Sequence, residues 1–151
     1  MERVKAFLKS EQFRELFVYV VVGSLTTAVN YLVYFAVSRA FAALTGCASD
    51  NAALLLGANI AAWIVSVAFA FWANKKHVFR SADWSKATLA KELPQFVAAR
   101  LFSLIFDAGF VLLTVRAFGM NDLTAKLLSN VLVIVINYFL SKFWIFRKPK
   151  T

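Results

Sequence analysis

The sequence predicts an all-α membrane protein in which four transmembrane helices form two related hairpins. Three observations lead to this fold class: the composition, four long apolar stretches, and a short motif that occurs twice. Hydrophobic residues make up 61% of the 151 residues, and Phe alone occurs 16 times. Soluble domains usually contain about 45–50% apolar residues. The composition therefore excludes an ordinary soluble domain.

Four apolar stretches are long enough to cross a bilayer. A helix that rises 1.5 Å per residue needs about 20 residues to cross ~30 Å of hydrocarbon. Strands of a membrane barrel would instead alternate polar and apolar residues over about 10 positions, and these stretches do not. The predicted spans are residues 16–37, 52–73, 96–118 and 123–146, within a single transmembrane domain of residues 1–151.

Two further segments mix apolar side chains with charges, which is typical of chain lying at the membrane surface. These interfacial segments are residues 2–15 and 81–94. We expect Pro94 in the first turn of the third helix, where a missing backbone N–H costs nothing.

A short motif of cations and aromatic residues closes the second and fourth spans. The first copy is Asn74-Lys75-Lys76-His77-Val78-Phe79-Arg80, and the second is Ser141-Lys142-Phe143-Trp144-Ile145-Phe146-Arg147. Lys75 matches Lys142, Phe79 matches Phe146 and Arg80 matches Arg147. The same number of residues separates the two members of each pair, and we call this separation the collar offset. Such a motif is typical of a membrane helix that ends at a charged lipid surface. We call residues 74–80 the first collar and residues 141–147 the second collar.

The repeat extends to the other two spans. A slightly larger separation, which we call the span offset, aligns the first span with the third, and it pairs Gly23 with Arg100 and Asn30 with Asp107. A longer loop between the first two spans accounts for the difference between the two offsets. Two hairpins that enter the membrane from the same side form a parallel repeat, whose axis runs along the membrane normal.

The distribution of cations predicts the orientation. Most of the 17 Lys and Arg residues lie in the two tails and in the loop between the second and third spans. By the positive-inside bias, these three segments are cytoplasmic. The formal net charge is +9, but the cations gather at the ends of spans rather than along one polar face. This placement favours anionic lipid head groups over nucleic acid as partners.

Several polar side chains fall inside the predicted spans, where a charged group costs about 2.5–3.5 kcal/mol on insertion scales. Arg100 and Asp107 are two helical turns apart and share a helix face, as do Lys126 and Asn130 at a spacing of one turn. We expect a polar groove to which these residues contribute: Asn30, Asn59, Asn74, Asp107, Asn130 and Asn137.

Two interpretations of these residues stay open. In one, Arg100 and Lys126 extend to opposite membrane surfaces, Asp107 pairs with one of them, and the asparagines hold helices together. In the other, the cations form a series for an anionic substrate, and Asp107 holds them in place when no substrate is present. That series is Lys75, Lys76, Arg80, Lys142 and Arg147 in the collars, then Arg100, then Lys126.

No motif in the chain indicates catalysis. The sequence has no Gly-rich phosphate loop, no nucleophile motif and no paired carboxylates, and its single cysteine, Cys47, excludes an intrachain disulfide and a Cys-based metal site. We therefore expect a protein that is not an enzyme and that needs no metal or cofactor.

Five segments occur in an order that is similar to a known family. They are Phe17-Val18-Tyr19-Val20-Val21-Val22-Gly23 followed by Asn30, then Asn74-Lys75-Lys76-His77-Val78-Phe79, then Arg100, then Ala125-Lys126, and finally Asn137-Tyr138 through Lys142-Phe143-Trp144-Ile145-Phe146. Together they cover nearly the whole chain. The sequence thus resembles the GtrA-like family of small bacterial four-helix membrane proteins.

This resemblance implies a role in the synthesis of cell-surface polysaccharide. Family members are proposed to move a polyprenyl-phosphate-linked sugar, often undecaprenyl-phosphate glucose, across the bacterial cytoplasmic membrane, where a membrane glycosyltransferase then uses it. Because four helices are few to enclose a sugar, we expect a homodimer or larger assembly. The residues to which the resemblance points are Asn74, Lys75, Arg100, Lys126, Asn137 and Lys142.

Two other functions are compatible with the same residues. A membrane scaffold that anchors a glycosyltransferase would need the collars but not the charges inside the spans. An exporter of the small multidrug type, also with four helices per chain, would need a carboxylate within the membrane, and Asp107 could serve. Against the exporter, Arg100 and Lys126 would repel a cationic drug.

Overall fold

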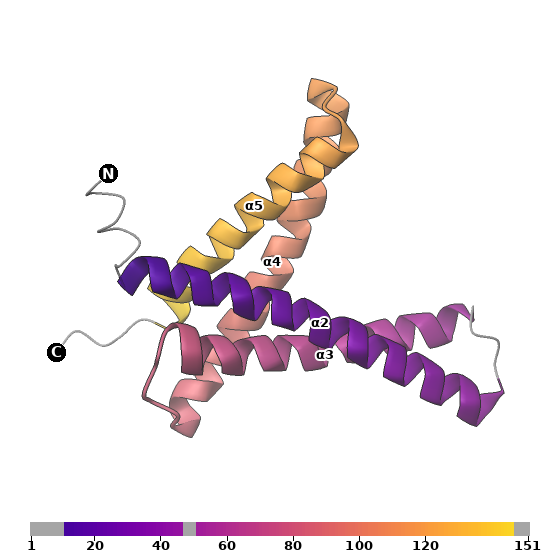
Figure 1. The fold of residues 1–151 in the computed structure, drawn as a ribbon, viewed down its shortest axis with the longest axis horizontal. Coiled ribbons are helices and arrows are strands. Elements are labelled where there is room, and N and C mark those ends of the chain that lie inside the picture. The colour runs from indigo at the N-terminus through magenta and orange to yellow at the C-terminus, as the bar shows by residue number, and fades with distance from the viewer. Residues whose placement is uncertain (1–10, 47–50, 147–151) are drawn as a thin grey trace. The chain divides into compact units, whose positions relative to one another are not determined.

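The computed structural model describes residues 11–46 and 51–146, and within these ranges the chain is helical without a β-strand. Four of its helices are long and apolar enough to cross a membrane. This confirms the predicted all-α fold with four transmembrane helices and makes the chain a multi-pass membrane protein. The chain divides into two compact units, Met1–Arg80 and Ser81–Thr151, and each unit contains one helical hairpin (Figure 1).

The first hairpin pairs two helices that lie side by side along much of their length (Figure 1). Helix α2 covers Glu11–Thr45, and helix α3 covers Ala52–Ala73 and continues directly into a short π-helix, η1, at Asn74–Val78. Asn51 begins α3, because its side-chain oxygen accepts hydrogen bonds from the backbone N–H groups of Ala53 and Leu54 at 3.0 and 3.2 Å.

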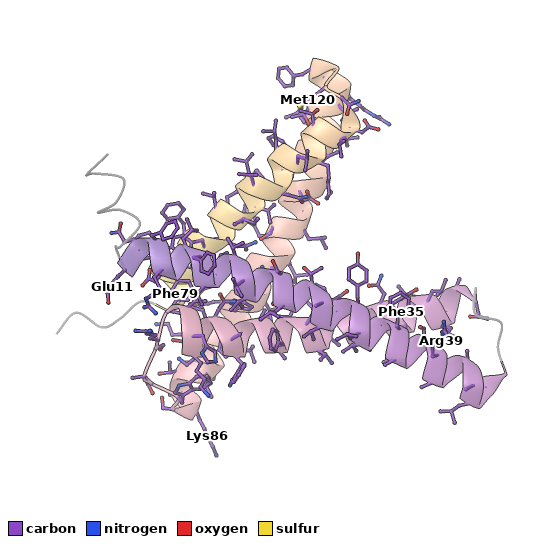
Figure 2. The ribbon with its side chains drawn as sticks, viewed as in Figure 1. Glu11, Phe35, Arg39, Phe79, Lys86 and Met120 are labelled. Carbon is purple, nitrogen blue, oxygen red and sulfur yellow. The ribbon has the colours of Figure 1, made fainter. Side chains whose placement is uncertain are left out.

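The second hairpin has the same plan. Helix α4 covers Lys86–Phe118, helix α5 covers Asp122–Leu140, and a second π-helix, η2, covers Ser141–Ile145. Gly119 ends α4 in the left-handed conformation, with a φ of 62°, which glycine adopts at low cost. Asn121 then begins α5 by accepting a hydrogen bond from the backbone N–H of Leu123 at 3.0 Å. Figure 2 shows Met120 at the tip between the two helices.

Small residues form much of the contact within each hairpin. Ala58 and Ala62 of α3 are almost fully buried, and so are Ala125 and Ser129 of α5. Lipid tails are as apolar as leucine, so helices in a membrane associate through close packing rather than through the hydrophobic effect. Small side chains allow that close packing, and the larger apolar residues are left on the outer surfaces of the hairpins.

The collars end the hairpins in matching ways. In each π-helix, a backbone N–H bonds to the carbonyl five positions earlier at 2.9 Å: Phe79 to Asn74 in η1, and Phe146 to Ser141 in η2. Each of these phenylalanines also packs against a ring on the first helix of its own hairpin. The ring centroids are 6.4 Å apart for Tyr19 and Phe79, and 6.1 Å apart for Phe96 and Phe146. Figure 2 shows Phe79 near the Glu11 end of α2.

These contacts follow the offsets of the predicted repeat. The two π-helices and their phenylalanines are related by the collar offset, and Tyr19 and Phe96 are related by the span offset. The match favours a common plan for the two hairpins. The repeat itself and the cytoplasmic location of the termini stay predictions.

The first and third helices are longer than the predicted spans. Helix α2 begins at Glu11, so residues 11–15 of the expected interfacial segment belong to the same helix as the span. Helix α4 begins at Lys86, which Figure 2 shows at the start of that helix. The expected interfacial segment 81–94 therefore splits into a loop and more than two turns of helix.

The expectation that Pro94 lies in the first turn of its helix is wrong, because Pro94 is inside α4. The helix begins earlier since Ser85 caps it: Ser85 Oγ accepts a hydrogen bond from the backbone N–H of Thr88 at 3.3 Å. Asp83 supports this cap by accepting a hydrogen bond from the Ser85 N–H at 2.8 Å. A proline at this place leaves the carbonyl of Ala90 without its usual helical donor.

Replacing Phe146 with alanine should lower the unfolding temperature in detergent, because its ring is buried and packs on Phe96. Deleting a buried Phe side chain typically costs about 3–5 kcal/mol. Phe143 of the adjoining π-helix is a matched control, since it is 61% exposed. Thermal unfolding followed by circular dichroism should rank Phe146→Ala well below Phe143→Ala and the parent protein. Equal losses at both positions would contradict the packing of the second collar.

Candidate functional site

A carboxylate at membrane depth is the centre of the candidate site. Asp107 lies on α4, about three helical turns before that helix ends at Phe118. Its Oδ2 accepts a hydrogen bond from Lys126 Nζ in an ion pair, and its Oδ1 accepts one from Ser129 Oγ at 2.7 Å. Both donors come from α5. We call Asp107, Lys126 and Ser129 the Asp107 cluster.

The Asp107 cluster is open on one side. The Lys126 side chain is 50% exposed and the Asp107 side chain is 20% exposed, whereas Ser129 is fully buried. The ammonium group is therefore held in place by the carboxylate, but a second anion can approach it from outside the helix pair. Lys126 also does not simply extend to the nearest membrane surface, because its Nζ bonds to a residue deep in α4.

A second polar contact joins the same two helices on the collar side of the cluster. Ser103 Oγ donates a hydrogen bond to Asn137 Oδ1 at 2.6 Å, and both residues are buried. Ser103 is one helical turn from Asp107 and about one turn from Arg100, so the three side chains share a face of α4. From Arg100 to Asp107 this face extends ~10 Å along the helix axis. We call Arg100, Ser103 and Asp107, with their partners on α5, the polar series.

Arg100 is at the collar end of the polar series. Its guanidinium carbon lies 4.9 Å from the ring centroid of Phe96, one turn earlier on α4. A cation over an aromatic face is attracted by the quadrupole of the ring. The side chain is half-buried, and within the described residues the ion-pair partner of Asp107 is Lys126 rather than Arg100.

The first hairpin has a neutral contact at the related position. Asn30 Nδ2 donates a hydrogen bond to Ser66 Oγ at 3.2 Å, and Ser66 Oγ donates to the carbonyl of Trp63 at 2.9 Å. Asn30 and Asp107 are the pair that the span offset aligns. A polar contact between helices therefore occurs in both hairpins, neutral between Asn30 and Ser66 and charged between Asp107 and Lys126.

Asn59 and Asn130 are not brought into these contacts. Both side chains are exposed on the outside of their hairpins, and neither makes a side-chain hydrogen bond to the described part of the chain. The stripe expected from Lys126 through Asn130 to Asn137 therefore divides: its two ends face α4 and its middle faces outward.

The cations of the collars differ in their surroundings. Lys75 is fully buried, and Lys142 is half-buried and donates a hydrogen bond to the Tyr138 hydroxyl at 3.0 Å. Lys76 and Arg80 are exposed, and Arg80 has a φ of 50°. Arg147 lies outside the described residues. In the described part of the collars, the exposed cations therefore belong to the first hairpin.

Asn74 has an unusual environment at the start of the first π-helix. It is buried, and its Nδ2 donates to the carbonyl of Ala70 at 2.7 Å. Its Oδ1 is buried without a hydrogen-bond partner in the described part of the chain. Such a group costs stability unless it is paired, so Asn74 is one of the residues able to accept a hydrogen bond from a ligand or water.

Sequence reasoning missed the hydroxyl groups of the site. Ser103, Ser129 and Ser66 each bond to one of the predicted polar residues. A helical stripe would have found the first two, because Ser103 lies between Arg100 and Asp107 on the same face and Ser129 follows Lys126 at the next turn.

A comparison with known families decides the relationship of the chain. The family model described as GtrA/DPMS, transmembrane domain, matches residues 18–146. The chain belongs to this family. The match covers both hairpins, including the Asp107 cluster and all described residues of the two collars.

Several relatives of similar length are known from bacteria. The chain is 35% identical over 132 residues to an uncharacterised membrane protein of Bacillus subtilis, YwcD, covering 87% of this chain and 96% of that protein. It is 30% identical over 155 residues to the cell wall teichoic acid glycosylation protein GtcA of Listeria innocua, covering 99% and 100% of the two chains. The GtcA of Listeria monocytogenes is 29% identical over 141 residues, covering 93% and 90%. No solved structure matches the chain.

The two charges of the Asp107 cluster should be coupled in stability. Asp107→Asn leaves the Lys126 ammonium group unpaired at membrane depth, and Lys126→Gln leaves the carboxylate unpaired. Each single variant should therefore unfold at a lower temperature than the double variant, in which both groups are neutral amides. Polar contacts between membrane helices are worth about 0.6 kcal/mol on average and up to about 1.7 kcal/mol.

The measurement is a double-mutant cycle of thermal unfolding in detergent. Asn130→Ala is the control, because Asn130 is exposed and lies outside the cluster. Losses that simply add in the double variant would contradict the ion pair.

Proposed function

We propose that this protein moves a polyprenyl-phosphate-linked sugar, of the undecaprenyl-phosphate glucose kind, across the cytoplasmic membrane for modification of a cell-surface polysaccharide. The observation that carries the proposal is the polar series of the second hairpin. This series brings two cations, a carboxylate and buried hydroxyl and amide groups together within one helix pair.

The chemistry of such a substrate matches these groups. Its phosphodiester is an anion and its sugar carries hydroxyl groups, and both must cross hydrocarbon while the isoprenoid tail stays in lipid. Arg100 and Lys126 can bind the phosphate, because guanidinium and ammonium groups donate strong hydrogen bonds to phosphate oxygens. Ser103, Asn137 and Asp107 can exchange hydrogen bonds with the hydroxyl groups of the sugar.

The Asp107 cluster suggests how the empty and loaded states differ. Without substrate, the carboxylate neutralises the half-exposed Lys126 ammonium group. A phosphate that reaches Lys126 replaces the carboxylate as its counter-ion, and Asp107 then accepts hydrogen bonds from the sugar hydroxyls instead. Neither state leaves the Lys126 ammonium group without a counter-ion at membrane depth, where it would be costly.

The relatives support the setting of this function. Two of them are named as cell wall teichoic acid glycosylation proteins, and glycosylation of a polymer outside the cell needs a sugar donor on the outer leaflet. A membrane glycosyltransferase that uses the delivered sugar would be the partner of this protein. The cytoplasmic termini and a homo-oligomeric assembly belong to the same proposal.

A membrane scaffold for the glycosyltransferase is the competing function. A scaffold requires only that the protein be folded and bound to the glycosyltransferase. The charges of the polar series could then be removed without loss of function. The exporter of cationic drugs loses support, because the carboxylate that it needs is paired with Lys126.

Transport by the purified protein in liposomes separates these functions. We expect the parent protein to accelerate the transbilayer movement of a short-chain polyprenyl-phosphate glucose, as measured by the accessibility of the sugar to an external oxidant. Arg100→Ala and Lys126→Gln should each slow this movement tenfold to a hundredfold, since a hydrogen bond to a charged group is worth about 1.5–3 kcal/mol.

Arg116→Ala is the control, because Arg116 is an exposed cation in the last turn of α4. Movement at the rate of empty liposomes for the parent protein, with each of several hexoses, would favour the scaffold. Movement that is fast in the parent and unchanged in both variants would exclude the polar series as the path.

A further inference from the structure

The two collar ends present different side chains at positions that the repeat aligns. Six exposed residues form two outward faces, three in each hairpin, and the collar offset relates each member of one face to a member of the other. The first face, which we call the Lys76 face, consists of Trp72, Lys76 and His77. The second, which we call the Phe143 face, consists of Phe139, Phe143 and Trp144.

The Lys76 face gathers two nitrogen-bearing side chains around one indole ring. Lys76 Nζ lies 5.1 Å from the ring centroid of Trp72, and the His77 ring centroid lies 5.3 Å from it at an interplanar angle of 76°. In an α-helix a side chain meets those three and four positions away. Because α3 continues into a π-helix with i to i+5 hydrogen bonds, Trp72 meets both the fourth and the fifth residue after it.

The Phe143 face has the same backbone and no cation. Phe139 and Phe143 are stacked, with ring centroids 5.7 Å apart and an interplanar angle of 11°. Trp144 stands where the first hairpin has His77. These rings are 51%, 61% and 53% exposed, so the face is an open apolar surface.

The neighbouring lysine does not supply the missing charge. Lys142 packs over Tyr138, with its Nζ 5.4 Å from that ring centroid, and it also bonds to the Tyr138 hydroxyl. In the first collar, by contrast, the buried Lys75 is followed by the exposed Lys76. The described part of the second collar therefore has no exposed cation where the first has one held against an indole.

We propose that the phosphate of the lipid-linked substrate docks on the Lys76 face and that the Phe143 face has no part in docking. The identity of the ligand rests on the proposed function. At the positions that the repeat aligns, the Lys76 face offers a phosphate a cation held against an indole ring, whereas the Phe143 face offers only aromatic rings. Trp72 holds Lys76 and His77 in place before the anion arrives, which reduces the entropy lost on binding.

The repeat supplies the test variants. Lys76→Phe gives the first hairpin the residue of the second, Phe143→Ala truncates the apolar face, and Lys76→Arg keeps the cation. Each protein is placed in phosphatidylcholine nanodiscs, and the binding of a radiolabelled short-chain polyprenyl-phosphate glucose is measured. We expect Lys76→Phe to weaken binding at least tenfold, whereas Lys76→Arg and Phe143→Ala stay within about threefold of the parent protein.

Competition identifies the source of the phosphate. Inorganic phosphate and phosphatidylglycerol should each displace the probe only at concentrations far above that of the unlabelled lipid-linked sugar. Equal displacement by phosphatidylglycerol would overturn the proposal in favour of a general lipid anchor. Unchanged binding in Lys76→Phe, with Lys76→Arg also unchanged, would overturn it by placing docking elsewhere.

The liposome transport assay separates this inference from the proposed function. Transport by the parent protein together with normal probe binding by Lys76→Phe would refute the docking site alone. Probe binding that depends on Lys76, in a parent protein that does not transport, would refute translocation and leave the docking site. The unfolding temperature of Lys76→Phe confirms that the variant is folded before either result is used.

Discussion

A bilayer contains no water to pair with peptide groups, so every backbone N–H and C=O inside it must find a partner within the chain. This constraint explains the continuous helices of both hairpins and the way in which they begin and end. Asn51 and Asn121 satisfy the first amides of α3 and α5, and the π-helices keep the ladder closed through the collars. Thr26 and Thr114 obey the same constraint, since each hydroxyl donates to the carbonyl one turn earlier, at 2.8 Å.

The same lack of water restricts which charged side chains the hairpins can hold. An ionised group at this depth is tolerated when it is paired, and Asp107 and Lys126 satisfy that condition for each other while Ser129 supplies one more hydrogen bond. The pair is nevertheless half-exposed on the lysine side, so it is not a closed structural bridge. The exposed side of the ammonium group can be reached by a second anion, and this favours the interpretation of the pair as a site of exchange for an anion.

The sequence predicted the number of helices and the ion-pairing residue well, because both depend on patterns along one helix. Hydrophobic length determines a span, and the unusual Asp107 in an apolar run required a cationic partner. The start of α4 was missed because Ser85 caps the helix ahead of Pro94, and a proline is compatible both with a first turn and with a later position. Asn59 and Asn130 are exposed, because the periodicity of a helix shows which residues share a face but not whether that face meets another helix. Their part in a polar groove stays a prediction. The π-helices were not predicted, since no residue pattern in the collars distinguishes them from an α-helical end.

The confinement of the polar series to one hairpin has a consequence for the stoichiometry of an assembly. The Asp107 cluster, the contact between Ser103 and Asn137, and Arg100 all belong to one hairpin, while the first hairpin has the uncharged contact between Asn30 and Ser66. A homo-oligomer would therefore hold one complete polar series per subunit rather than a shared one. In mixed assemblies of intact and inactivated subunits, activity would then fall in proportion to the inactivated fraction instead of being abolished by a single defective copy.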